Sequence, residues 1–157
     1  MQTAAEAAIV DATAVHLGID LLRHREATTI SLGKDVRVEV DAASPDRSVV
    51  VEACARQGRL KGAQLRKVAQ DILKLALLQE GSESKSIERF IVFASTEAEQ
   101  SVKGWVREAA ERFGIRFLVV DVPQELRDSI LTAQSRQVMV NVDQVADDVG
   151  VPSEADQ

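Results

Sequence analysis

The stretch that decides the fold runs from Val36 to Leu75 and reads VRVEVDAASPDRSVVVEACARQGRLKGAQLRKVAQDILKL. Its first residues alternate between apolar and polar, and Val49–Val51 is wholly apolar, as is typical of β-strands. The sequence Ser-Pro-Asp-Arg between these two runs predicts a turn. From Gly62 on, apolar residues recur every three or four positions, which predicts a long helix. The stretch therefore predicts a hairpin of two strands followed by a helix.

The rest of the chain predicts further helices and strands on both sides of this hairpin. Two apolar runs later in the sequence predict strands that are covered on both faces. The helical pattern between these runs indicates a crossover, which normally joins parallel strands. The sequence Thr96-Glu97-Ala98-Glu99 fits a capping box at the start of that helix. The predicted helices span 3–25, 62–79, 96–113 and 124–137, and the predicted strands span 28–32, 36–42, 48–55, 90–94 and 117–122.

Length and composition predict one soluble domain. The 157 residues are 45% hydrophobic, enough to bury a core without disulfides. We expect this α/β domain to span 1–142 and to be followed by an acidic, flexible tail over 143–157. Cys54 is the single cysteine, and the chain begins without a basic leader or an apolar run of about 20 residues, so we expect a cytoplasmic protein with no membrane segment.

Charge is distributed unevenly along the chain. Six basic residues and one acidic residue between Ala55 and Leu75 give that segment a charge of +5, so the rest of the chain carries −11 of the total of −6. Such a local excess of positive charge indicates an anionic partner, either DNA or an acidic protein surface. An ordinary solvated helix face is the alternative explanation.

Two carboxylates on neighbouring predicted strands are the candidate metal ligands. Alternation places Asp41 on one face of the strand over 36–42, and Glu52 interrupts an apolar run in the next strand, where a carboxylate is costly without a partner. If the strands pair as a hairpin, both side chains can share a face and hold Mg²⁺. The alternatives are that Asp41 simply ends a strand and that Glu52 pairs with Arg56. Asp46 sits in the predicted turn and ranks below Asp41.

The order helix, three strands, helix, strand, with these two acidic residues, resembles the PD-(D/E)XK nuclease superfamily. This resemblance covers about 4–122 and implies a restriction-endonuclease-like α-β-β-β-α-β core, a mixed central sheet of four to five strands flanked by helices, with a further C-terminal strand and helix. It also implies a Mg²⁺-dependent deoxyribonuclease in which Asp41, Glu52 and the backbone carbonyl of Ala53 bind the metal. The stretch RQGRLKGAQLRKVAQDILKL also resembles a group of bacterial proteins, which implies a family but no activity.

The family's catalytic lysine is missing from its usual place. It lies two residues after the glutamate, and Cys54 stands there in this chain. Arg56 or Lys67 could supply the charge instead, although Arg56 cannot act as a base because its pKa is too high. Alternatively, Lys67, Asp71 and Lys74 form an exposed salt-bridge ladder. The sequence leaves open an enzyme with a displaced lysine, or a catalytically inactive protein of the same fold that binds nucleic acid or a protein.

The loop over 57–62 and the helix after it supply the candidate DNA-binding residues. The two glycines of the loop and the helix N-terminus predict backbone amides that hold a phosphate, with an ordinary tight turn as the alternative. Trp105 is expected to be partly in the core, and Glu6 to be a further acid near the site. His16 and His24 lack the spacing of a zinc pair. The side chains expected to bind DNA are Arg59, Lys61, Gln64, Arg66 and Lys74.

Overall fold

The computed structural model describes residues 3–80 and 85–147, with side chains placed up to residue 138. In this part of the chain, a four-stranded sheet and a two-stranded sheet combine with helices in an α/β fold. The elements, in chain order, are α1 (Ala4–Leu17), α2 (Arg25–Thr28), β1 (Thr29–Ser31), β2 (Arg37–Glu39), β3 (Ala42–Ala43), β4 (Val49–Cys54), α3 (Gly62–Glu80), β5 (Glu88–Phe93), α4 (Thr96–Ser101), α5 (Gly104–Arg112), β6 (Ile115–Val119) and α6 (Gln124–Asp147).

The larger sheet is mixed and has the strand order β3-β4-β5-β6. Strand β3 pairs antiparallel with β4, and Ala42 lies opposite Val51. Strands β4, β5 and β6 are parallel, and the chain crosses between them through α3 and then through α4 and α5. These pairings confirm the predicted hairpin and the predicted parallel crossover from β5 to β6, and they add a parallel pairing of β4 with β5.

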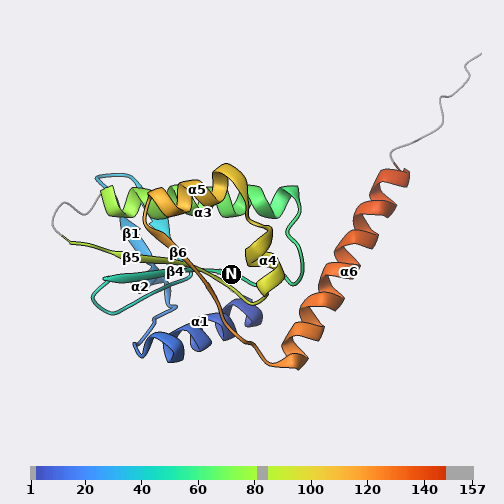
Figure 1. Cartoon of the computed structure of the whole chain (residues 1–157), viewed down its shortest axis with the longest axis horizontal. Helices are drawn as coiled ribbons and strands as arrows, with labels where there is room; N and C mark the ends of the chain where they lie inside the picture. The colour runs from blue at the N-terminus through green and yellow to red at the C-terminus, as the bar shows by residue number, and fades with distance from the viewer. Residues whose placement is uncertain (1–2, 81–84, 148–157) are drawn as a thin grey trace, which may run out of the picture.

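Helices cover both faces of this sheet (Figure 1). On one face, Val50, Ile91 and Phe93 pack with buried residues of α3, such as Leu75. On the other face, Val51, Val92 and their neighbours pack against α1. Side chains of β4 are thus buried on both faces, which explains its continuous apolar run. The single carboxylate in that strand, on Glu52, therefore has to lie inside the protein.

The first helix is shorter than the sequence predicted. It ends at Leu17, eight residues before the predicted end, because Gly18 takes a left-handed conformation with φ of 66° and its N–H donates to the carbonyls that end the helix. The chain then returns to the sheet edge, where Leu22 pairs with Ala43. The predicted strand over 36–42 is also divided, into β2 and β3.

The predicted helix over 96–113 is two helices. It breaks after Ser101 and restarts at Gly104, whose φ is 64°. The Arg107 guanidinium donates to the carbonyls of Glu99 and Val102, which lie at this break. The start of α4 is also different from the prediction, because Ser95, not Thr96, is the residue whose hydroxyl caps the helix.

Helix α6 extends away from the rest of the molecule (Figure 1). It continues to Asp147, so the first five residues of the stretch predicted to be a tail are helical, and residues 148–157 of that stretch lie outside the described residues. No helix in residues 3–80 and 85–147 is long and apolar enough to cross a membrane.

Candidate functional site

Asp41 and Glu52 lie close together at the sheet edge, where Asp41 raises the pKa of Glu52. Asp41 comes just before β3, and its N–H donates to the carbonyl of Val51, the residue opposite Ala42, so the regular register ends at Ala42. The Asp41 carboxylate accepts the N–H of Ala53 at 2.8 Å, which holds it against β4. Glu52 points toward α3 and is only 2% exposed. The predicted hairpin thus brings the two carboxyl groups close together.

Glu52 forms an ion pair with Lys74 of α3. The Lys74 Nζ lies 2.5 Å from the Glu52 Oε1 and donates to the carbonyl oxygen of Glu39 at 2.8 Å. The alternative that Glu52 pairs with Arg56 is therefore wrong. Lys74, which was expected to bind DNA, instead contacts the buried carboxyl group of Glu52 inside the protein.

A second lysine and a second carboxylate of α3 extend this pair into a network. Lys67 donates to Asp71 at 3.2 Å, and the Lys74 Nζ lies 3.8 Å from Asp71. Because these residues are three and four positions apart, they share one side of the helix. The predicted salt-bridge ladder is thus present, but it is not simply exposed, because Asp71 is only 8% exposed and the ladder reaches Glu52 through Lys74.

Burial dominates the electrostatics of this network. It raises the pKa of Glu52 to about 9, with Asp41 and Asp71 adding to the rise and Lys74 opposing it. Burial also raises the pKa of Asp71, against the effect of Lys67 and Lys74. Burial works against the charge of Lys67, but the neighbouring carboxylates, Asp71 first, outweigh it and raise the Lys67 pKa. With a pKa of about 9, Glu52 is protonated at neutral pH in the absence of a bound cation.

A pocket of about 300 Å³ opens beside this network. Asp41 and Lys67 both line it, together with Glu6 of α1 and Arg23. The Glu6 carboxylate also accepts the N–H of Thr3 and so belongs to the capping box of α1. The side of α3 that carries Lys67 thus faces the same cavity as Asp41, as a displaced lysine would require.

Cys54 and Arg56 do not supply the missing positive charge here. Burial raises the pKa of the Cys54 thiol, so the thiol is neutral at physiological pH. Arg56 lines a different pocket, between the start of α1 and α6, where Thr3 and Ile130 are also lining residues. Of the two residues proposed to replace the lysine, Lys67 is the one that lines the pocket with Asp41.

The loop over 57–62 does not form the predicted phosphate cradle. Four of its backbone amides already donate to side-chain oxygens: Gln57 to Gln134, Gly58 to Ser95, Leu60 to Ser101, and Lys61 to Gln64. These bonds fix the loop onto α4 and α6. The alternative of an ordinary tight turn describes the loop better, because backbone amides that already donate hydrogen bonds within the protein are not free to bind an anion.

The remaining residues expected to bind DNA have different surroundings. Arg59, Lys61 and Arg66 are exposed, while Gln64 is half-buried and its side chain accepts the Lys61 N–H. Asp46, the lower-ranked acid, accepts bonds from Ser48 and Ser44, which lower its pKa to about 2 and give it a structural role in the turn.

Trp105 is the residue whose position the sequence reasoning missed. It was expected to lie partly in the core, yet 75% of it is exposed. The expectation assumed one continuous helix over 96–113. Because the chain breaks and restarts at Gly104, the helical phase of α5 is not the phase of α4, and Trp105 is placed on the outer surface. Only the glycine just before the tryptophan hinted at this restart.

The described residues supply few ligands for a metal ion. They contain no group of three or more histidines, cysteines, aspartates or glutamates arranged to hold one. The expected pair, Asp41 and Glu52, suits Mg²⁺, which is bound by one or two carboxylates and keeps several waters for a phosphate to replace. Lys67 and Lys74 already lie among these carboxyl groups, so a bound Mg²⁺ would have to favour the ionised form of Glu52, whose pKa burial raises to about 9.

Comparisons of the chain with protein-family models, with curated proteins and with solved structures gave no match. The chemistry of the site therefore has to be inferred from its own residues.

Proposed function

We propose that this protein is a Mg²⁺-dependent phosphodiesterase that acts on DNA, with Asp41 and Glu52 as metal ligands and Lys67 as the displaced lysine. One observation carries the proposal: Glu52, which is 2% exposed, lies close to Asp41, and Asp41 and Lys67 line one pocket. A buried ion pair usually stabilises a protein less than apolar residues of the same size would. The buried ion pair of Glu52, in an otherwise apolar strand, is therefore better explained by a catalytic role than by a contribution to stability.

The order of the elements is compatible with this proposal. A helix, an antiparallel strand pair, a helix and a parallel strand follow one another in α1, β3, β4, α3 and β5. The PD-(D/E)XK resemblance implies an α-β-β-β-α-β core. Here α2, β1 and β2 lie between α1 and β3, and β1 and β2 form a separate two-stranded sheet, so the agreement covers the antiparallel strand pair, α3 and β5. The proposal assigns the pocket beside Asp41 to the scissile phosphate.

Each residue of the proposed site has a distinct role. A bound Mg²⁺ would polarise the phosphate and lower the pKa of a coordinated water. The raised pKa of Lys67 keeps its ammonium charged at neutral pH, so it would stabilise negative charge on the phosphate and would not remove a proton. Lys74 would hold the Glu52 carboxylate in place through their ion pair.

A second candidate function is a catalytically inactive module that binds nucleic acid. Two observations favour it: Cys54 replaces the lysine of the motif, and the ammonium of Lys74 already partners Glu52. In this case DNA binding needs no metal, survives Glu52→Gln, and is lost when Arg59 and Lys61 are neutralised.

Cleavage assays separate the two functions. The purified protein is incubated with Mg²⁺ or Mn²⁺ and with linear, circular and single-stranded DNA. We expect cleavage that is abolished in Glu52→Gln and Asp41→Asn and that falls by ~100-fold or more in Lys67→Met, because a charge at the reacting phosphate is lost. Glu111→Gln, which changes an exposed carboxylate on α5, is the matched control and should cleave normally.

Two results would reject catalysis. One is the absence of cleavage of every substrate with either metal. The other is cleavage that persists at full rate in both Glu52→Gln and Asp41→Asn, which would mark a contaminating nuclease. Circular dichroism of each variant excludes a general loss of folding as the cause of a lost activity.

A further inference from the structure

A groove runs along the surface between α3 and α5, on the side of α3 that faces away from Asp41. One part has a volume of about 530 Å³ and is lined by Arg59, Arg66, Lys103 and Trp105. An adjoining part of about 320 Å³ shares Trp105 and continues to Leu73 and Phe113. The two parts form one groove, positively charged at one end and apolar at the other, with Trp105 in both.

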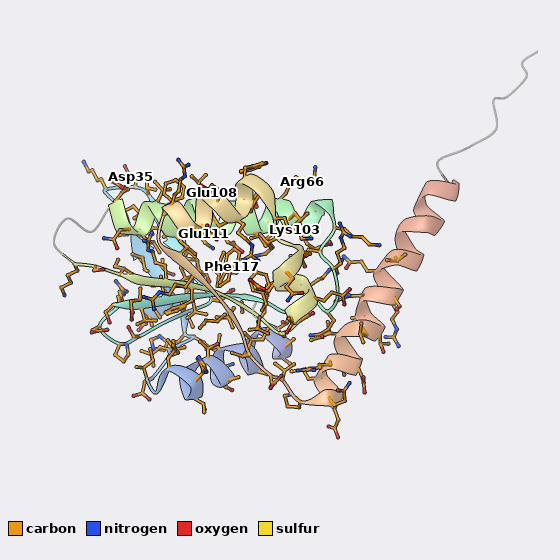
Figure 2. The ribbon with its side chains drawn as sticks, in the orientation of Figure 1. Asp35, Arg66, Lys103, Glu108, Glu111 and Phe117 are labelled. Atoms are coloured by element: carbon orange, nitrogen blue, oxygen red, sulfur yellow. The ribbon has the colours of Figure 1, made fainter. Side chains whose placement is uncertain are left out.

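The charge of this groove is not compensated locally. Its first part is lined by three cations and by no acidic residue that the structure describes. None of these cations has an ion pair within residues 3–80 and 85–147. Arg66 and Lys103 lie toward the same end of the helical layer, and Glu108 and Glu111 lie toward the other end (Figure 2). The groove is thus suited to a negatively charged ligand.

The aromatic rings of the groove are placed for stacking. Trp105 is 75% exposed and Phe113 is 50% exposed, which is unusual for large apolar side chains in a domain with a well-formed core. Positions 105, 109 and 113 follow a four-residue spacing, so the two rings lie on one side of α5, about 12 Å apart along the helix. Planar aromatic groups next to cations are the combination that binds the bases and phosphates of a single strand.

We propose that this groove binds single-stranded DNA, with a base stacked on Trp105 and phosphates on Arg66, Lys103 and Arg59. A duplex fits the surface less well, because its bases stack on one another and do not present a free face to a tryptophan. An acidic protein segment would satisfy the charges, but it would leave an exposed indole without a planar partner.

The groove also has a geometric relation to the candidate site. Both lie along α3, on opposite flanks, and the exposed Lys61 and the half-buried Gln64 lie near the N-terminus of this helix. A strand held on Trp105 could pass around that end of α3 to the pocket lined by Asp41 and Lys67. This path rests on the proposed function, whereas binding in the groove does not require it.

The single tryptophan of the chain makes the groove directly observable. Intrinsic fluorescence is measured while a 12-nucleotide oligo-dT is added in the presence of EDTA, so that binding is read without cleavage. We expect quenching by the oligonucleotide, because a stacked base contacts the indole, and little quenching by an abasic oligonucleotide of the same charge. Binding without quenching, or equal quenching by the abasic oligonucleotide, overturns the proposal.

Salt dependence tests the three cations. Neutralisation of three phosphates of a single strand predicts a slope of about −2 for log K against log salt concentration. The double variant Arg66→Gln/Lys103→Gln should retain a slope of about −0.7 and bind more weakly at low salt. Lys34→Gln, which removes an exposed lysine in the turn between β1 and β2, is the matched control. Equal affinities for the control and the double variant overturn the proposal.

The role of the Trp105 indole in binding is tested by substitution and by competition. Trp105→Ala should lower the affinity for a labelled oligo-dT at least about fivefold in fluorescence anisotropy, and Trp105→Phe should lower it less. An oligo-Glu peptide of equal charge should compete only weakly. If this peptide or a DNA duplex binds more tightly than the single strand, the proposal is wrong. Because all of these measurements exclude the metal, their failure is distinct from a failure of cleavage.

Discussion

The two flanks of α3 hold charged side chains under opposite conditions. On one flank, Lys67, Asp71 and Lys74 connect to the buried Glu52 through ion pairs. On the other flank, Arg66 lies with Lys103 in an open groove without an ion pair in the described part of the chain. On one flank of α3 the charged side chains are thus paired inside the protein, and on the other flank they are solvated by water.

This difference predicts how each flank responds to mutation. In the low dielectric of the interior, a charge that loses its partner cannot be solvated, so the free energy of folding changes. At the surface, water and salt replace a lost partner, so a substitution changes binding while stability stays nearly constant. Substitutions on the two flanks can therefore distinguish residues that stabilise the fold from residues that only bind a ligand.

The largest expected effect is the pH dependence that Glu52 causes. Its pKa of about 9 in the folded protein is above the ordinary value of 4.5, so the folded state binds the proton more tightly than the unfolded state does. This contribution to stability is complete below pH ~4.5 and is lost as the pH rises toward 9. We expect the wild type to lose several kcal/mol of unfolding free energy between pH 5 and pH 9 relative to Glu52→Gln.

Urea denaturation followed by far-ultraviolet circular dichroism at pH 5, 7 and 9 measures this difference. Glu52→Gln should be the more stable protein at pH 9, and the gap should narrow toward pH 5. Parallel pH profiles for the two proteins would mean that Lys74 keeps Glu52 ionised throughout this range and that burial does not control its titration.

The second effect is the loss of the buried partner in Lys74→Ala. Removing one member of a buried ion pair typically costs about 3–5 kcal/mol, since the other charge stays buried. The loss should be greater at pH 9 than at pH 5, where Glu52 can take up a proton instead. Lys67→Ala is the control on the same flank. Its side chain is 62% exposed, so it should cost only about 1 kcal/mol. Equal losses in the two variants would contradict the buried character of the Glu52–Lys74 pair.

Short-range patterns in the sequence were sufficient for most of the fold. The alternation and the turn between the strands predicted the antiparallel pairing of β3 with β4, and the two later apolar runs predicted the parallel pairing of β5 with β6. The helix boundaries were less accurate, at Gly18 and at Gly104. At both positions a glycine with positive φ ends or restarts a helix, and an apolar periodicity that continues past it hides the break.

The site was predictable where it depends on two strands joined by a short turn and not where it depends on the packing of a distant helix. The closeness of Asp41 and Glu52 followed from the predicted hairpin. The partner of Glu52 did not, because Lys74 lies 22 positions away and reaches it only through the packing of α3 on the sheet. The exposure of Trp105 was missed for a similar reason, since it depends on where α4 ends.

The third prediction concerns the cap that ties the 57–62 loop to α4. The hydroxyl of Ser95 accepts the N–H of Ala98 and that of Gly58, both at 3.2 Å. We expect Ser95→Ala to lower the unfolding free energy by about 1–2 kcal/mol, since one helix cap and one loop contact are lost. Thr96→Ala, which changes the residue that the sequence suggested as the cap, should cost less than about 0.5 kcal/mol. If urea denaturation shows a larger loss for Thr96→Ala than for Ser95→Ala, Thr96 is the residue that caps the helix.

The smallest effect on stability is expected on the open flank. Arg66→Gln/Lys103→Gln should change the unfolding free energy by less than about 0.5 kcal/mol, because neither side chain has a buried partner to leave behind. The same double variant should weaken binding of single-stranded DNA, so affinity and stability move independently. Lys74→Gln, the same kind of substitution on the buried flank, should lower the unfolding free energy more than the groove variant does. If the groove variant loses as much stability as Lys74→Gln, its cations also hold the fold, and the distinction between the two flanks fails.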